Sequence, residues 1–327
     1  MKAIVINDPV GPTGLLLKEL DDPIAGPDDI VVDVKATALN RADLAQTNGN
    51  YPAPTGSPAD IPGLEMAGVV LTTGRHVTEF KPGDRVFGLL GGGGYASRVA
   101  LHHRLAVPIP DGLDFVQAAA CPEVFYTAYD ALFNHCQLKM GERVLIHAAG
   151  SGVGTAAIQL SKLCGAFTFG TAGSQEKLSK ARPLGLDVGI NYQEDDFEQI
   201  ITRETKGEGV NVILDMVGGP YWGRNLRCLS MEGRMVLVGA LGGGKIDADI
   251  RKLMPKRLTI HGTVLRSRPL EEKIALTQQF RKYVVPSLDH SALVPVVDKI
   301  FPLEEASQAL QYMESNTNFG KIVLTVN

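Results

Sequence analysis

Up to residue 120, the chain consists of short apolar runs separated by glycine and proline. Short runs bounded by these turn formers are typical of β-strands. We predict strands at 3–6, 30–34, 67–71, 85–89 and 96–100. Two loops interrupt them, a proline-rich one at 51–63 and a tetraglycine at 91–94. We expect both loops at the surface, because irregular segments of this kind seldom pack as core.

Beyond residue 120 the pattern changes to an alternation of helices and strands. Apolar residues three and four apart predict the helices, and short apolar runs between them predict the strands. The helices span 115–120, 124–134, 152–164, 175–182, 195–205 and 221–229, and the strands 144–147, 167–171, 188–191, 210–214, 235–238 and 259–261. This order predicts an α/β fold with a parallel sheet covered by helices on both faces. The chain ends with helices at 270–283 and 304–313 and a strand at 321–326, and a return of this tail to the first half is open.

Length and charge restrict the class of protein further. The 327 residues suggest about two domains. The net charge of −4 provides no strong field for nucleic acid or an anionic membrane, and the short basic strip at 251–257 is most simply a solvated helix face. No window approaches the ~20 apolar residues that span a bilayer, and the apolar start at 3–6 is too short for a signal peptide. We therefore expect a cytoplasmic protein that binds neither membranes nor nucleic acid.

The cysteines exclude two further classes of protein. Cys121, Cys136, Cys164 and Cys228 are widely spaced and form no CxxC pair. This spacing argues against a tetrathiolate zinc lobe and against a secreted disulfide scaffold. We interpret Cys121 as a buried cysteine at the start of a helix rather than as a reactive thiol.

A glycine-rich turn joins the predicted strand at 144–147 to the helix at 152–164. It reads Gly150-Ser151-Gly152-Val153-Gly154, with its last glycine one position earlier than in the G-x-G-x-x-G pattern. Glycines let the backbone approach a pyrophosphate, which the free N–H groups and the dipole of the helix N-terminus attract. The strand–turn–helix context predicts a dinucleotide site, and an ordinary tight turn is the alternative.

The end of the second strand of this half distinguishes NAD from NADP. An NAD site usually has a carboxylate there, but residues 170–175 contain none. Ser174 and Lys177 instead offer a hydroxyl and a cation, which suit a 2′-phosphate, and Tyr192 follows the third strand at the same edge. We predict NADPH as the cofactor. The alternatives are a helix N-cap for Ser174, a solvated charge for Lys177 and a strand-end aromatic for Tyr192.

The first domain has no evident set of zinc ligands, and we predict no metal site. No cysteine precedes Cys121, and the only histidines are His76, His102 and His103. The last two are adjacent, so their side chains are expected to diverge on a strand. Without zinc, no Lewis acid stabilises an alkoxide. The sequence therefore favours an acceptor that takes a hydride without such help, for example a quinone or an activated C=C bond.

Several motifs spread over the chain carry a resemblance to a known family. They lie at 40–44 with 49–52, at 63–70, at 80–86, at 127–129 and at 147–154. Leu64 stands where zinc-dependent relatives have a histidine. On these motifs the chain resembles the zinc-independent NADPH:quinone oxidoreductases of zeta-crystallin type, in the medium-chain dehydrogenase/reductase superfamily. The resemblance covers nearly the whole chain.

The resemblance implies a fold and a division into domains. A GroES-like β-rich domain would comprise 1–121, with 287–327 returning to it. A Rossmann domain with a doubly wound parallel sheet would comprise 122–286. NADPH would bind between the two domains. Homodimerisation is implied by the family alone.

The resemblance also assigns roles to single residues. Asn40 and Tyr51 match positions that line the quinone pocket, and we predict that they orient a quinone oxygen. Thr127 matches a contact to the nicotinamide. The remaining matches to cofactor contacts are Ser151, Gly152 and Val153 at the pyrophosphate, Ser174, Lys177 and Tyr192 at the 2′-phosphate, Gly239, Ala240, Leu241, Leu265, Arg266 and Ser267 beside the nicotinamide, and Phe319, Gly320 and Lys321 in a turn that closes over the cofactor. Thr47 and Asn48 depart from the arginine common in this loop, which leaves the substrate range open.

These residues together predict hydride transfer from NADPH to a quinone, with the proton supplied by solvent or by Tyr51. An NADPH-dependent alkenal or enone reductase on the same scaffold is one alternative, and the acceptor reduced would distinguish it. A low-turnover NADPH-binding sensor or structural protein is the other, and tight cofactor binding without reduction of any acceptor would identify it.

Overall fold

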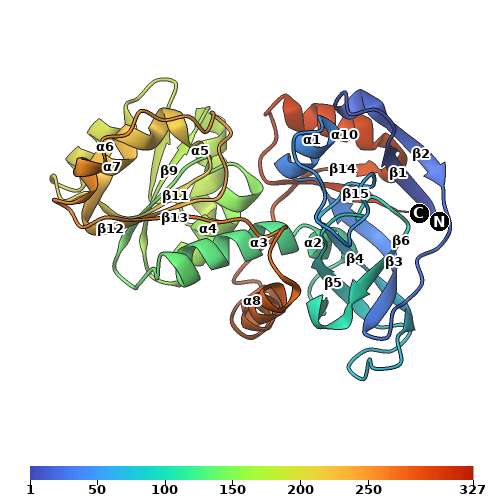
Figure 1. Cartoon of the computed structure of the whole chain (residues 1–327). Coiled ribbons are helices and arrows are strands. Elements are labelled where there is room, and N and C mark those ends of the chain that lie inside the picture. Colours follow the sequence, from blue (N-terminus) through green and yellow to red (C-terminus); the bar gives the residue numbers. More distant parts are fainter. Residues whose placement is uncertain (327) are drawn as a thin grey trace. The chain divides into compact units, whose positions relative to one another are not determined.

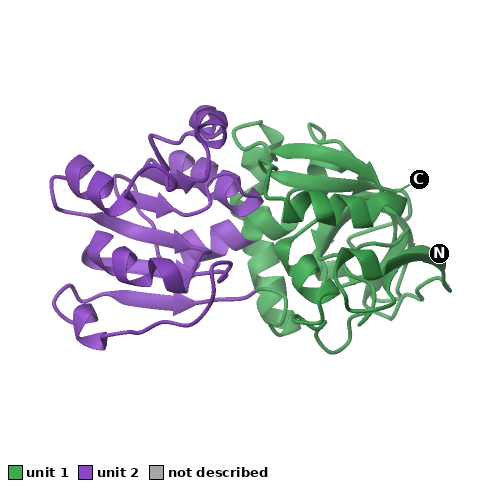
Figure 2. Cartoon of the chain, turned by 90° about the horizontal axis from the view of Figure 1, so that it is seen from above, with its two compact units in different colours: residues 1–126, 265–327 green, residues 127–264 purple. Residues whose placement is uncertain are grey.

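A computed structural model describes residues 1–326 of the chain. They form two compact units: the first comprises 1–126 and the chain from 265 onward, and the second comprises 127–264 (Figure 2). The predicted domain bounds stay a prediction, and the compact units differ from them at 122–126 and at 265–286. The segment 265–286 packs within the first unit because Phe280 of α8 (Leu270–Tyr283) stacks on Tyr126, with ring centroids 4.1 Å apart, and meets Phe87 edge-on at 6.4 Å.

The first unit contains a largely antiparallel sheet (Figure 1). Among residues 1–326 its strand order is β14-β15-β3-β4-β5-β7, with β6 also paired to β3. The strands are β3 (Asp29–Ala38), β4 (Glu65–Thr73), β5 (Arg85–Leu89), β6 (Arg98–His102), β7 (Ala106–Pro108), β14 (Val297–Pro302) and β15 (Lys321–Thr325), and β1 (Lys2–Ile6) pairs separately with β2 (Leu15–Glu19). The last strand joins this unit through antiparallel pairing of β15 with β3, where Val323 faces Ala38.

Helices complete the first unit. Ile30, Val32 and Val34 alternate along β3 into its apolar core, as the period of a strand requires. Val31 of the same strand is also buried, because helices cover part of the sheet's other face. The helices are α1 (Arg41–Thr47), α2 (Phe115–Ala119), α3 (Pro122–Tyr129), which continues into the second unit, α8, α9 (Val285–Asp289) and α10 (Ala306–Glu314). The helix predicted at 124–134 is α-helical only to Tyr129 and continues as a π-helical turn over Asp130–His135.

The second unit is built on a six-stranded parallel sheet. In the part of the chain that the structure describes, its order is β10-β9-β8-β11-β12-β13. In chain order this reads 3-2-1-4-5-6, the doubly wound Rossmann topology, so the predicted α/β fold is confirmed. The strands are β8 (Arg143–Ile146), β9 (Phe167–Ala172), β10 (Val188–Asn191), β11 (Val210–Asp215), β12 (Leu229–Leu237) and β13 (Thr259–Gly262), and the helices α4 (Gly152–Leu163), α5 (Gln175–Ala181), α6 (Phe197–Glu204) and α7 (Trp222–Cys228).

The expectation of two surface loops holds for residues 51–60, which are exposed or half-exposed, and was wrong for 61–63 and for the tetraglycine loop. Residues 61–64 and 92–94 have little exposed surface. Their backbones bond to each other: Gly93 N donates to Ile61 O at 2.8 Å, and Gly94 N donates to Gly63 O at 3.0 Å. Paired polar groups make burial possible, and a Cβ on Gly94 would lie 2.8 Å from Glu65 O.

Within residues 1–326 no helix has the length and apolar character that crossing a bilayer requires.

Candidate active site

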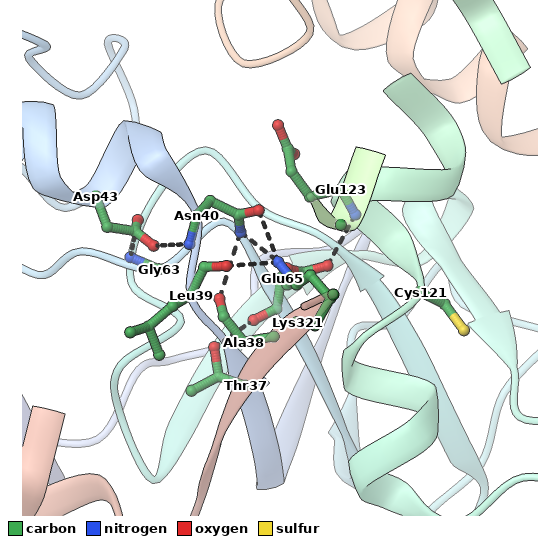
Figure 3. A network of polar contacts seen from close by, with 12 residues as sticks. Thr37, Ala38, Leu39, Asn40, Asp43, Gly63, Glu65, Cys121, Glu123 and Lys321 are labelled. Carbon is green, nitrogen blue, oxygen red and sulfur yellow. Dashed lines mark hydrogen bonds and ion pairs between the residues drawn. The ribbon is translucent and has the colours of Figure 1, made fainter. Parts of the chain in front are cut away.

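A buried ion pair lies at the centre of a polar network in the first unit (Figure 3). Lys321 of β15 contacts Glu65 of β4, with 2.7 Å between Nζ and Oε1. The same ammonium donates to Asn40 Oδ1 at 2.7 Å and to Leu39 O at 2.6 Å. Three acceptors therefore occupy the three N–H donors of Lys321. Its predicted contact to a cofactor stays a prediction, but this structure accounts for the ammonium within the first unit.

Asn40 links this network to the start of α1. Its Nδ2 donates to Glu65 Oε1 at 2.8 Å and to Ala38 O at 3.3 Å. Both amide hydrogens are thus engaged, and Oδ1 already accepts from Lys321. The amide can offer a ligand one further lone pair on Oδ1 and no free donor. In this arrangement Asn40 could accept from a hydroquinone hydroxyl, whereas donation to a quinone oxygen requires one of these bonds to break.

Asp43 fixes the loops beside Asn40. Its Oδ2 accepts from Asn40 N at 2.7 Å and from the Tyr95 hydroxyl at 2.9 Å, and its Oδ1 accepts from Gly63 N at 3.3 Å. Burial raises the pKa of Asp43 to about 6, against the opposing effect of these donors. The carboxyl joins α1 to the segment before β4 and to the end of the glycine loop.

Glu123, near the start of α3, joins the network through its backbone. Its N–H donates to Glu65 Oε2 at 2.8 Å, while Figure 3 shows its own carboxyl directed away from Glu65 and Lys321. Burial, followed by repulsion from Glu65, raises the pKa of the Glu123 carboxyl to about 8. At neutral pH, the Glu123 carboxyl is therefore protonated in a large part of the protein molecules.

Cys121 lies two residues before Glu123 but takes no part in this network. Its thiol is fully buried and points away from Glu65 and Lys321 in Figure 3. Burial raises the pKa of the Cys121 thiol well above its usual value. A thiol that stays protonated is a poor nucleophile, so the interpretation as a buried structural cysteine is confirmed.

Arg266 holds the loop that carries Tyr51. Its guanidinium donates to Gly91 O at 2.8 Å, to Tyr51 O at 3.2 Å and to Gln46 Oε1 at 2.7 Å. The cation also lies 5.1 Å from the centroid of the Tyr51 ring. One buried arginine thus connects α1, the tetraglycine loop and the predicted quinone-pocket tyrosine.

In the second unit, the glycine turn leads from β8 into α4 as the sequence predicts. Ser151 caps the helix, with its Oγ accepting from Gly154 N at 3.0 Å. The N–H groups of Gly152 and Val153 lie in the first turn, where a helix has no acceptor of its own for them. A Cβ on Gly154 would lie 2.4 Å from Ala148 O. This backbone has the donors and the close approach that a pyrophosphate needs, so it fits a dinucleotide.

A buried hydrogen-bonded chain joins three strands beneath this turn. Asn225 Nδ2 donates to Asp215 Oδ2 at 3.0 Å, which turns Asn225 Oδ1 toward His147 Nε2 at 2.8 Å. Nε2 must then carry the proton, and Nδ1 accepts from the Thr171 hydroxyl at 3.0 Å. Burial lowers the pKa of His147, so the ring is neutral. These hydrogen bonds hold the carboxyl ends of β8, β9 and β11 together at the point where the strand order reverses.

The three residues predicted at a 2′-phosphate follow β9 and β10. Ser174 caps α5 by accepting from Lys177 N at 3.3 Å, so its N-cap interpretation is correct. Tyr192 is 41% exposed and follows β10 directly. A Cβ on Gly173 would lie 2.7 Å from the Tyr192 hydroxyl, which puts this hydroxyl beside the turn that ends in Ser174. The structure therefore brings Tyr192 to the start of α5, and phosphate binding there stays a prediction.

The other predicted cofactor residues are divided between the units. Gly239, Ala240 and Leu241 follow β12 at the same sheet edge as the glycine turn, and all three are exposed. Thr127 lies within α3 and is partly exposed. In the first unit, Ser267 is exposed, whereas Leu265 and Phe319 are 7% exposed, and Phe319 N donates to Asp298 Oδ1 at 3.1 Å.

The adjacent histidines do not diverge as expected. The rings of His102 and His103 stack, with centroids 5.2 Å apart and an interplanar angle of 18°. The expectation was wrong because the strand ends at His102 and a 3₁₀ turn begins at His103, so the alternation of a strand no longer applies.

Comparisons with known proteins give the family of the chain. A profile described as "Alcohol dehydrogenase GroES-like domain" matches residues 26–111, and one described as "Zinc-binding dehydrogenase" matches residues 152–281. The quinone oxidoreductase of Lama guanicoe is 32% identical over 327 residues, which cover 99% of this chain and 97% of that protein. The chain is a medium-chain dehydrogenase/reductase of the quinone oxidoreductase family. The predicted combination of a GroES-like and a Rossmann domain is thereby confirmed.

Three solved structures resemble this quinone oxidoreductase-type chain over its length. An NAD-dependent alcohol dehydrogenase has a TM-score of 0.90 at 31% identity and covers 100% of both chains. The Escherichia coli quinone oxidoreductase complexed with NADPH has a TM-score of 0.88 at 29% identity, with 99% of this chain and 100% of that chain covered. The CurK enoyl reductase has a TM-score of 0.87 at 28% identity, with 100% and 99% covered.

One of the matching profiles is named for zinc, which this quinone oxidoreductase-type chain does not fit. Among residues 1–326, no three His, Cys, Asp or Glu side chains gather as a metal site. A catalytic zinc needs about three such ligands, and Leu64, beside Glu65, is a buried apolar residue. The residues that the structure describes therefore do not provide the ligand set of a catalytic zinc.

Sequence reasoning missed the roles of several residues of this family member. Glu65 and Glu123 had no role assigned, and Arg266 was considered only beside the nicotinamide. A signal existed for Glu65, because it is the one charged residue in the apolar run from 63 to 70, and a buried carboxylate needs a partner. That partner, Lys321, is 256 residues away in the chain. No local pattern in the sequence points to it.

Proposed function

We propose that this protein transfers a hydride from NADPH to a quinone without a metal. The observation that carries the proposal is the end of β9, where residues 170–175 offer no carboxylate to a ribose 2′-hydroxyl. Ser174, Lys177 and Tyr192 surround the start of α5 instead. The relationship to quinone oxidoreductases, one of them solved with NADPH, supports both the cofactor and the acceptor.

The chain's own residues would bind and orient the reactants. Bound NADPH supplies the hydride. The first-turn N–H groups of Gly152 and Val153 would hold the pyrophosphate, and Lys177 would neutralise the 2′-phosphate. Tyr51, fixed by Arg266, would donate a hydrogen bond to a quinone oxygen. Asn40 would keep the pocket in shape through its bonds to Glu65 and Lys321. Homodimerisation and a cytoplasmic location stay predictions.

The direct test is the oxidation of NADPH by an ortho-quinone. The loss of NADPH is measured by its absorbance at about 340 nm. Parallel reactions use NADH and protein pretreated with a chelator. Turnover that prefers NADPH and survives the chelator supports the proposal. Turnover that requires added zinc, or NADPH binding without reduction of any quinone, contradicts it.

Replacing Lys177 by alanine tests the cofactor assignment separately. We expect the dissociation constant for NADPH to rise about 10-fold, or about 1.4 kcal/mol, because one charge-assisted contact to the 2′-phosphate is lost. The dissociation constant for NADH should stay the same. Lys180→Ala is the matched control, since Lys180 lies one turn further along α5 and pairs with Glu176. Equal losses for both cofactors would argue against a 2′-phosphate contact.

A second candidate function is reduction of an activated C=C bond. The similarity to the CurK enoyl reductase favours it, and the same hydride donor would serve. Steady-state rates with a matched enone and quinone distinguish the two functions. A kcat/KM for the enone well above that for the quinone would favour this candidate.

A further inference from the structure

The carboxyl of Glu123 is an ionisable group at the edge of the polar network of the first unit. Its backbone N–H is fixed to Glu65, so the first turn of α3 is held against β4. The side chain turns the other way, as Figure 3 shows, and is only partly buried. Within residues 1–326 no group hydrogen-bonds to this carboxyl, although every other carboxyl of the network, Glu65 and Asp43, has several donors. An unpartnered acid at the edge of a buried network can take a ligand as its partner.

The charged and titratable groups around Glu123 come from every neighbouring element. Glu65 on β4 and Asp43 on α1 repel its negative charge, while Lys321 on β15 and Arg266 ahead of α8 attract it. Tyr51, in the loop after α1, also interacts with it electrostatically. The effects of burial and of the two carboxylates exceed those of the two cations, so the pKa of Glu123 rises to about 8. An acid poised near neutral pH is well matched to donate a proton during a reaction.

Tyr51 is less suited to that task. Burial, followed by the negative charge of Glu123, raises the pKa of Tyr51 above its usual value of about 10. A phenol with such a pKa keeps its proton at neutral pH and acts as a hydrogen-bond donor. Its position is set by Arg266. Of the two, Glu123 is therefore the stronger acid.

The sequence spacing also relates Glu123 to the predicted nicotinamide contact. Thr127 follows Glu123 by four residues in α3, and side chains four residues apart lie on one side of a helix, about 5–6 Å apart at Cβ. Within α3, the acid and the residue assigned to the nicotinamide thus share one side of the helix.

We propose that Glu123 is the general acid of this reductase and gives its proton to the substrate oxygen that becomes negative during reduction. The proposal rests on the proposed function. The quinone takes up the hydride at one of its oxygens, where an O–H bond forms. The ring becomes aromatic, and the electron pair of the second carbonyl π bond collects on the second oxygen as the negative charge of a hydroquinone anion. The O–H bond of Glu123 then breaks and an O–H bond forms at that oxygen. The products are the hydroquinone, NADP⁺ and a Glu123 carboxylate, which regains a proton from solvent.

The test is the isosteric variant Glu123→Gln in the full chain, assayed with NADPH and an ortho-quinone as a function of pH. Wild-type kcat should fall as pH rises through about 8, because the carboxyl loses its proton. At neutral pH the variant should lose about 100-fold in kcat. This is the lower end of the range for a general acid, because a hydroquinone anion is itself fairly stable. The fall of kcat at alkaline pH should be missing in the variant. Its dissociation constant for NADPH should not change.

A measurement without cofactor or turnover gives independent evidence. Infrared difference titration of the free protein should show a protonated carboxyl near neutral pH that Glu123→Gln removes. Glu271→Gln, another first-turn helix glutamate but 72% exposed, is the matched control and should leave both the band and kcat unchanged. If wild-type protein turns over quinone but Glu123→Gln keeps its rate and pH profile, or the band is missing, the role of Glu123 is wrong. If wild-type protein reduces no quinone, the proposed function fails first and this role fails with it.

Discussion

Replacing Lys321 by methionine is expected to lower the free energy of unfolding by about 3–5 kcal/mol. Lys321 and Glu65 have 4% and 0% of their side-chain surface exposed and lie 2.7 Å apart. Methionine restores much of the volume but not the charge, so the Glu65 carboxylate would stay buried beside two N–H donors, Asn40 Nδ2 and Glu123 N. Urea denaturation followed by circular dichroism measures the loss from the midpoint at constant slope.

The exposed ion pair of α5 provides the control for this prediction. Lys180 and Glu176 lie 2.6 Å apart but are 50% and 74% exposed, so Lys180→Met should cost less than about 1 kcal/mol. Adding Glu65→Gln to Lys321→Met removes the uncompensated charge and should restore most of the lost stability. If Lys321→Met costs no more than Lys180→Met, or the second substitution restores nothing, the buried pair does not stabilise the fold in this way.

The second unit could be predicted from sequence because its pattern is local. Each of the strands β8 to β11 is a short apolar run followed by a helix, and the bounds of β10 agree with the prediction at every residue. The glycine turn needs only neighbours along the chain: Ser151 caps α4 three residues ahead of the N–H that it accepts from. Chemistry that is contained within a few consecutive residues is visible in the sequence.

The candidate site of the first unit could be predicted only in part. Asn40 and Tyr51 were chosen from motifs, but the partners that define what they do come from distant segments: Lys321 for Asn40, and Arg266 for Tyr51. Burial of a charged residue depends on which strands pair, and β15 reaches β3 across almost the whole chain. The strands β2 and β14 were missed for a related reason. β2 is largely exposed, and β14 has a single buried residue among half-buried and exposed ones, so neither shows the apolar alternation of a half-buried strand.

Placing a methyl group on Gly154 is expected to abolish tight cofactor binding. The Cβ of Gly154→Ala would lie 2.4 Å from Ala148 O and 2.8 Å from Ala149 Cα, both backbone atoms that cannot rotate away. Relief requires α4 to move away from the glycine turn, which misplaces the N–H groups of Gly152 and Val153. We expect the dissociation constant for NADPH to rise roughly 100-fold, or about 2.8 kcal/mol, and the stability to fall by roughly 1–3 kcal/mol.

Titration of the nicotinamide fluorescence measures this loss, and a parallel urea denaturation separates it from unfolding. Gly262→Ala is the matched control, because Gly262 ends β13 with open space where its Cβ would lie and without a left-handed φ. That variant should bind NADPH as the wild-type protein does. A Gly154→Ala protein that is folded and binds NADPH with unchanged affinity would show that the pyrophosphate does not depend on the close approach of α4 to the turn. Folded protein with weakened binding would instead locate the cofactor's phosphates at this turn, because the added methyl group changes no charge and removes no hydrogen-bonding group.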